Sequence, residues 1–135
     1  MIELINYTKF SFADTKRLKR WIVSSVKKEG FLVDNISLFI ITDNELSKIN
    51  KEFLSHTTLT DIITFNYSKE KALLCEIYIS SERVLENAKI FSVTPEKEML
   101  RVMIHGILHC CGYNDKSVDQ KSAMTKQENF YISRY

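Results

Sequence analysis

The chain is poor in the residues that break regular structure, because its 135 residues include only 3 glycines and 1 proline. Tight turns depend on these residue types, so few of them are available. This scarcity disfavours an all-β sandwich and favours long helices with short connections. With 44% hydrophobic and 27% charged residues, the composition is that of an ordinary globular protein. We therefore expect one domain spanning residues 1–135, long enough to bury its own core.

Cysteine is also scarce, and its pattern excludes a disulfide framework. The three cysteines are Cys75, Cys110 and Cys111, an odd number of which two are adjacent. Such usage suits a reducing compartment, and we expect a cytoplasmic location.

Long hydrophobic runs and a strong charge imbalance are missing as well. No apolar run approaches the roughly 20 residues that cross a bilayer, and residues 1–4 do not begin a signal peptide. We therefore expect no membrane partner. The net charge is +2, which permits a nucleic-acid partner without indicating one.

Stretches typical of strands and helices follow one another along the chain. β-branched and aromatic residues or alternation indicate strands, and apolar residues at helical spacing, with capping residues, indicate helices. The predicted strands are 2–6, 36–41, 61–67 and 73–79, and the predicted helices begin at Asp14, Thr42, Ser80 or Ser81, Thr94 and Ser117. The helix from Ser80 or Ser81 should bury Val84, Leu85, Ala88 and Phe91. These elements predict an α+β fold with a small mixed sheet covered by several helices.

One helix should run through the middle of the domain. It starts at Thr94-Pro95-Glu96, which supplies a capping hydroxyl, a proline at the first helical position and an acid in the first turn. The residues from Val102 to Cys111 are apolar nearly all round, as expected of a buried helix. Gly112 follows where a helix end needs a left-handed residue.

This central helix carries the residues with the clearest chemistry. His105 and His109 are four residues apart, so both side chains project from one face of the helix. Gly112 turns the chain back, and Asp115 then arrives as a third ligand. Three protein ligands leave a fourth tetrahedral position open, which is typical of catalytic zinc. We predict one Zn²⁺ per chain, or another divalent metal, held by His105, His109 and Asp115.

A histidine pair at this spacing has a second interpretation, as two satisfied core residues. Three observations favour metal. The pair accounts for two of the 3 histidines in the chain, and it lies on the most apolar helix, where an unpaired imidazole is costly. The following glycine and acid also stand at the spacing of metzincin proteases. Gly106, however, occupies the position of the zincin catalytic glutamate, and it cannot transfer a proton.

Other polar residues leave two interpretations open. Asp61 is either an orienter of a ligating histidine or a turn acid before a strand. Arg101, four residues before His105, either faces the site and contacts phosphate or is solvated. Cys110 and Cys111 either complete a closed metal site or pack, and we favour packing. His56 has no partner that the sequence identifies, and we expect it to be exposed.

The first predicted helix is basic. Its cations either track an RNA backbone or form a solvated face. They are Lys16, Arg17, Lys19, Arg20, Lys27 and Lys28.

Several motifs resemble the YbeY family of metal-dependent endoribonucleases. The stretch from His105 to Tyr113 resembles the family's H-G-x-L-H-x-x-G-Y. Residues 48–53 with 60–65 resemble its L-N-x-x-Y-R…T-D-V-L-S-F segment, and residues 74–80 resemble its G-D-I-x-I-S strand. Met124 and Glu128 match an M-x-x-x-E pattern in the last helix. The motifs occur in family order from about residue 36 to the C-terminus.

The resemblance implies a single-strand-specific endoribonuclease. It would act in the cytoplasm on the 3′ end of small-subunit (16S) ribosomal RNA and in ribosome quality control, beside small-subunit proteins. The implied site residues are the metal ligands His105, His109 and Asp115, with Arg101 and Asp61 as further candidates. A metal held there would polarise a phosphate oxygen and activate water for attack on phosphorus; attack by a 2′-hydroxyl is the alternative.

The chain departs from the family pattern at three positions. Asp115 stands in place of a third histidine and makes the metal a weaker Lewis acid. Leu54 stands in place of an arginine suited to a scissile phosphate, and Glu76 replaces an aspartate. The replacement at Leu54 keeps open a non-catalytic, zinc-containing ribosome-assembly factor. The metzincin-like spacing leaves a metallohydrolase of another class as a second alternative, against which Gly106 counts.

Overall fold

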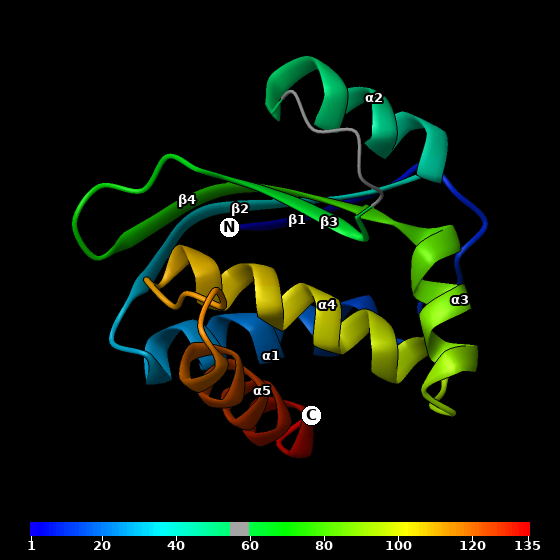
Figure 1. Cartoon of the computed structure of the whole chain (residues 1–135). Coiled ribbons are helices and arrows are strands. Elements are labelled where there is room, and N and C mark those ends of the chain that lie inside the picture. Colours follow the sequence, from blue (N-terminus) through cyan, green and yellow to red (C-terminus); the bar gives the residue numbers. More distant parts are fainter. Residues whose placement is uncertain (55–59) are drawn as a thin grey trace.

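The computed structural model describes residues 1–54 and 60–135, apart from the side chain of Leu54. The replacement at Leu54 and the expected exposure of His56 therefore concern side chains outside the described residues. The strands are β1 (Ile2–Asn6), β2 (Leu32–Ile41), β3 (Ile62–Asn66) and β4 (Ala72–Ser80). The helices are α1 (Thr15–Lys28), α2 (Asp43–Leu54), α3 (Ser81–Ile90), α4 (Pro95–Cys110) and α5 (Val118–Ser133). Figure 1 shows α1, α4 and α5 on one side of the sheet and α2 on the other.

The sheet is mixed, as predicted. Its strand order is β1-β2-β4-β3, in which β1, β2 and β4 run parallel and β3 pairs antiparallel with β4 at one edge. β2 begins at Leu32, four residues before the predicted start at residue 36. Polar Asp34 and Asn35 interrupt the apolar run there, and the register with β4 shifts between Val33 and Asn35. An irregular strand start of this kind lacks the period-two pattern that marks a strand in the sequence.

The main core lies between the sheet and the helices α1, α4 and α5. Ile36, Leu38 and Ile40 of β2 are fully buried there, together with Ile22 of α1 and Met103 of α4. Within the described residues a second, smaller cluster contains Ile41, Leu46 and Ile63. The mixed sheet and the helices packed against it confirm the predicted α+β fold.

Helix α4 is the central helix that the sequence predicts. Ten of its 16 residues are buried. The side chain of Thr94 accepts a hydrogen bond from the backbone N–H of Lys97, and Pro95 opens the helix. Gly112 follows the helix end with a φ of +103°, a conformation that glycine adopts without the steric cost of a Cβ. The predicted start, burial and end of this helix are confirmed.

Gly106 allows α4 to lie directly against the sheet. A Cβ atom at this position would be 2.8 Å from Cδ1 of Ile62 and 3.2 Å from Oγ1 of Thr64, both on β3. These separations are shorter than ordinary van der Waals contact. Because Gly106 has no side chain, helix α4 can approach strand β3 this closely.

The predicted burial on α3 is half wrong. Val84 and Ala88 are buried, but Leu85 and Phe91 are 41% and 61% exposed. The helix starts at the end of β4, with Ser80 as its cap, and Figure 1 shows it at the end of the sheet. Only a narrow stripe of such a helix meets the core, so the flanking apolar positions face solvent. In the described part of the chain, no helix is long and apolar enough to cross a membrane.

Candidate metal centre

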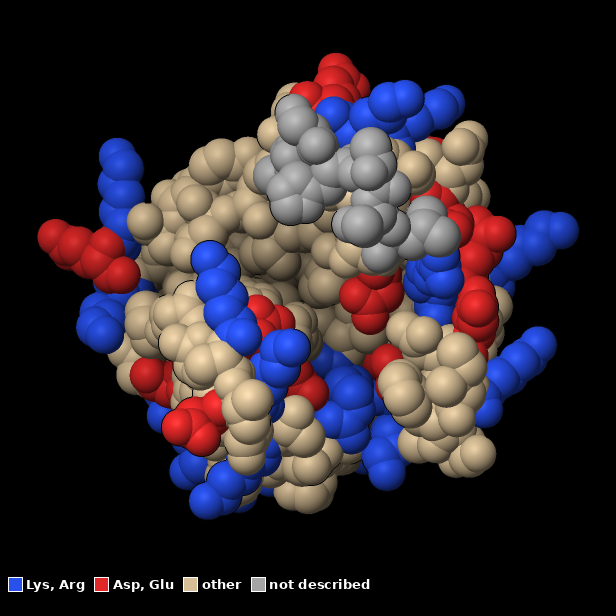
Figure 2. All heavy atoms as spheres, viewed as in Figure 1, with Lys and Arg blue, Asp and Glu red and all other residues tan. Residues whose placement is uncertain are grey.

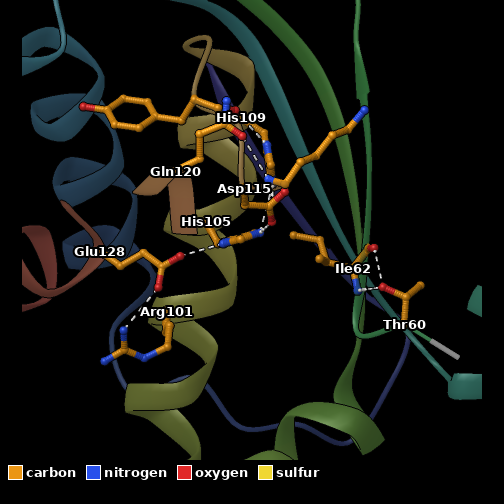
Figure 3. Close-up of polar contacts among 10 residues, drawn as sticks. Thr60, Ile62, Arg101, His105, His109, Asp115, Gln120 and Glu128 are labelled. Atoms are coloured by element: carbon orange, nitrogen blue, oxygen red, sulfur yellow. Dashed lines mark hydrogen bonds and ion pairs between the residues drawn. The ribbon is translucent and has the colours of Figure 1, made fainter. Parts of the chain in front are cut away.

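The three predicted ligands converge on one point. His105 and His109 project from the same face of α4, and Asp115 reaches them from the loop after Gly112 (Figure 3). The two Nε2 atoms are 3.0 Å apart, and Oδ2 of Asp115 lies 3.3 Å from each of them. Among the described histidine, cysteine and acidic residues, these three form the one cluster able to hold a metal ion.

The separations fit a tetrahedral metal ion. A tetrahedral ion with bonds of about 2.0–2.1 Å holds its ligand atoms roughly 3.3 Å apart, close to the 3.0–3.3 Å found here. The side chains of His105, His109 and Asp115 are 26%, 30% and 38% exposed, so solvent reaches the cluster. Three protein donors and an accessible side leave room for a fourth ligand from solvent or substrate.

Hydrogen bonds at the Nδ1 atoms of His105 and His109 orient both rings so that their Nε2 atoms face Asp115. Nδ1 of His109 lies 2.9 Å from the backbone carbonyl oxygen of Tyr113; a carbonyl only accepts, so this Nδ1 carries the proton. Nδ1 of His105 lies 2.6 Å from Oε2 of Glu128 on α5, and a carboxylate likewise favours a proton there. With both protons on Nδ1, the neutral rings present the Nε2 lone pairs that a metal requires.

The same contacts change how His105 titrates. Burial alone lowers its pKa, but the hydrogen bond that His105 donates to Glu128 and the negative charges of Glu128, Asp115 and Asp61 outweigh this effect and raise the pKa overall. The raised pKa favours a second proton on His105 when no cation is bound. A divalent cation balances the same charges and displaces that proton.

Glu128 is also paired with Arg101. The guanidinium Nη1 of Arg101 lies 3.2 Å from Oε1 of Glu128, and its Nη2 donates to Oδ1 of Asn129 at 2.9 Å. In this structure Arg101 is engaged with α5, and its contact with phosphate stays a prediction. Its long side chain reaches toward α5 and holds the buried carboxylate that orients His105 (Figure 3).

A pocket of about 530 Å³ opens beside the three ligands, between α4 and strand β3. Asp61, Thr64, Asn66 and Cys110 are among the residues that line it, and Figure 2 shows a hollow on this face of the molecule. Asp61 thus lies at the site, but the Nδ1 atoms of the two histidines are bonded to Glu128 and Tyr113. Its proposed role as orienter of a histidine is not supported by this geometry. Burial raises the pKa of Asp61.

The cysteines pack rather than ligate, as the sequence favours. Cys75 and Cys110 are buried in the main core, and Cys111 packs against it. The Cys75 thiol donates to Oδ1 of Asn66 at 3.8 Å. Burial raises the pKa of the Cys111 thiol to about 12.

A second network holds the loop that carries Asp115. The hydroxyl of Tyr113 donates to Oε1 of Glu29 at 2.9 Å. Glu29 caps the end of α1 and also accepts from Gln127 and Tyr131 of α5. The backbone carbonyl that orients His109 therefore belongs to a residue tied to two other helices.

Glu128 is the site residue that sequence reasoning missed. It entered only as part of a resemblance motif, although its side chain is 8% exposed and bonded to His105. A signal was present, because this acid stands four residues after Met124, whose apolar side chain is buried on α5. An acidic residue on the buried face of a helix needs a partner.

Known proteins resemble the chain over nearly its whole length. The family model described as Endoribonuclease YbeY matches residues 4–135. Proteins named Endoribonuclease YbeY from Flavobacterium johnsoniae and Chlorobium limicola are 41% and 42% identical, over 100% and 87% of this chain and 97% and 82% of theirs. A solution structure of a Thermotoga maritima protein is similar with a TM-score of 0.71 and 31% identity, over 98% of this chain and 87% of the other.

Proposed function

The chain belongs to the YbeY endoribonuclease family, and from this membership we propose that it is an endoribonuclease that cuts single-stranded RNA in ribosomal RNA processing. The relatives' names support the nuclease activity, and their coverage of both chains supports carrying it to the whole of residues 1–135 as one domain. The observation that carries the proposal is the cluster of His105, His109 and Asp115, which lines an open pocket.

We propose that these three residues hold one divalent metal, preferably zinc. Imidazole nitrogens and one carboxylate are a familiar zinc donor set, and the 3.0–3.3 Å separations suit it. When bound, such a metal supplies Lewis-acid activation of water or of a phosphate oxygen. Asp115 contributes a negative charge, which lowers the Lewis acidity of the metal relative to a third histidine.

The chain's own residues position the reaction. Glu128 keeps the proton of His105 on Nδ1, and the carbonyl of Tyr113 does the same for His109. Thr64 and Asn66 of β3 also line the pocket, and the amide of Asn66 donates to the backbone carbonyl of Cys110 at 3.4 Å. We propose that RNA enters along this strand, across from α4.

The peptidase alternative is not favoured by the geometry. A peptidase of the zincin type needs a glutamate at the position of Gly106, and a side chain there would collide with Ile62. A non-catalytic assembly factor has no specific observation in its favour. The cytoplasmic location, the 16S 3′ end as target and the small-subunit protein partners stay predictions.

Two measurements test the proposal together. Elemental mass spectrometry of protein purified without a metal-affinity tag should find about one metal ion per wild-type chain and less in Asp115→Ala. The variant His109→Ala should lose both the metal and the cleavage of a single-stranded RNA. Asp119→Ala, an exposed acid on α5, is the matched control and should keep both. Full cleavage by His109→Ala in chelator-treated buffer would show that the activity arises elsewhere.

A further inference from the structure

A second polar pocket, of about 260 Å³, lies between α1 and the C-terminal turn of α5. Four cationic side chains line it: Arg17, Arg20, Lys28 and Arg134. Within the described part of the chain, no aspartate or glutamate lines this pocket or forms an ion pair with these four side chains, although Arg17 donates to the main-chain oxygen of Tyr135. Like charges held this close repel one another, so an anion placed among them would stabilise the arrangement.

The basic surface continues along α1. A shallow neighbouring basin shares Arg20 and Ser24 with the first pocket and adds Lys19 and Lys27. Arginine suits phosphate because its planar guanidinium donates two parallel hydrogen bonds, and the exposed hydroxyl of Ser24 is a further donor. A row of such groups along one helix fits several successive phosphates better than one small anion.

Aromatic rings stand beside these cations. Phe130 is 37% exposed, and the Arg134 guanidinium lies 5.4 Å from its ring centre. Tyr135 lines the pocket and is half-buried, with Arg17 over its ring at 4.2 Å. Unpaired bases stack on aromatic and guanidinium planes. A single strand of RNA supplies both the phosphates and the exposed bases that this surface can bind.

We infer that this pocket, with the basic face of α1, is a second RNA-binding site that anchors single-stranded substrate away from the metal centre. The inference rests on the proposed function for the identity of the ligand. Helix α5 joins the two sites, since Glu128 orients His105 while Tyr131 and Arg134 line the basic pocket. RNA long enough to reach both sites would be held at two places.

The single tryptophan of the chain makes the inference testable at the pocket itself. Trp21 lines the pocket, and its indole N–H donates to the carbonyl of Tyr131 at 2.8 Å. Titrating the purified full-length protein with single-stranded RNA should change the emission of Trp21. Binding confined to the metal pocket would leave this emission unchanged and would overturn the inference.

Charge removal gives the second arm of the test. The double variant Arg20→Gln, Lys28→Gln should weaken RNA binding on the order of tenfold and lower the salt slope of log K by about 1.4, since each lost contact to single-stranded RNA removes roughly 0.7. The control Lys89→Gln, Lys97→Gln removes the same charge from exposed positions on α3 and α4 and should change neither. The RNA is checked for integrity after each titration.

The outcomes separate this site from the nuclease proposal. Loss of binding in the pocket variant, with no cleavage by any variant, would support the RNA site and contradict the enzyme. If the wild type cleaves RNA and the pocket variant keeps the RNA affinity and salt slope of the wild type, the enzyme is supported and the second RNA site is contradicted. Inorganic phosphate alone distinguishes the ligand: a Trp21 response to phosphate but none to RNA would assign the pocket to a free anion and overturn the inference.

Discussion

Nδ1 of His105 lies 2.6 Å from the carboxylate of Glu128, although the two residues are 23 positions apart and belong to different helices. Glu128 is buried, with its side chain 8% exposed, and Arg101 offsets its charge at 3.2 Å. The packing of α5 against α4 therefore decides which nitrogen of His105 faces the metal centre. The histidine, the acid and the arginine act as one unit in which each member fixes the next.

We expect Glu128→Gln to weaken metal binding by roughly 10- to 100-fold, because the amide holds the imidazole without the negative charge that makes it a better ligand. Competition with a chromophoric chelator measures the affinity. Asn129→Ala, which removes the neighbouring partner of Arg101, is the control and should have a smaller effect. Equal affinity in Glu128→Gln and wild type would remove Glu128 from the site.

The metal-free protein should lose stability as the pH rises above about 6.5. The folded-state pKa of His105 is raised, chiefly by Glu128 against the opposing effect of burial. The resulting stabilisation is fully present below the unfolded-state pKa of about 6.5 and is lost as pH rises through the higher folded pKa. Urea unfolding in chelator at a series of pH values measures this loss. In Glu128→Gln the slope should flatten, and an unchanged slope would contradict the assignment.

Tyr113→Phe should loosen the loop that carries Asp115. The change removes the hydroxyl donor to Glu29, and a hydrogen bond to a charged group contributes about 1.5–3 kcal/mol. We expect a lower free energy of unfolding in chelator and, because the same residue's carbonyl orients His109, a weaker affinity for zinc. Tyr7→Phe alters an exposed tyrosine and provides the baseline. Loss of stability with full metal affinity would show that the loop finds its position without Glu29.

Gly106→Ala should destabilise the protein by roughly 1–3 kcal/mol, the usual cost of overpacking, because the new Cβ would lie 2.8 Å from Cδ1 of Ile62. Ile62→Val removes that Cδ1 atom. Urea unfolding of both single variants and the double variant completes a thermodynamic cycle. We expect a favourable coupling of about 0.5–3 kcal/mol, and strictly additive effects would mean that the helix does not touch β3 at this point.

Local features of the sequence predict local features of the site. The spacing of His105 and His109 and the turn at Gly112 predict that Asp115 reaches the pair, because these residues lie within eleven consecutive positions. Caps at Thr94 and Ser117 likewise mark where α4 and α5 begin. Side chain–backbone hydrogen bonds of this kind depend only on near neighbours.

Contacts between distant segments do not follow from such patterns. Arg101 stands one turn before His105, so spacing alone suggests that it faces the metal, yet its flexible side chain reaches Glu128 instead. The approach of Glu128 depends on how α5 crosses α4, which no local pattern records. The backbone carbonyl of Tyr113 cannot be predicted as a partner of His109 from residue types, since every residue has a backbone carbonyl. The same limit applies to the exposure of Leu85 and Phe91, which depends on where α3 lies against the sheet.

The close contact at Gly106 also bears on how this scaffold can evolve. Zincin peptidases have their proton-transferring glutamate directly after the first histidine. The single substitution Gly106→Glu would create that motif in this chain. The new side chain would meet strand β3 before it reached solvent, since Ile62, Thr64 and Ile77 already surround the position within 3.3 Å. Conversion to peptide hydrolysis would therefore require the sheet to move as well. New activities are more accessible through the loop after Gly112 and the pocket-lining edge of β3, where substitutions change the substrate wall without separating α4 from the sheet.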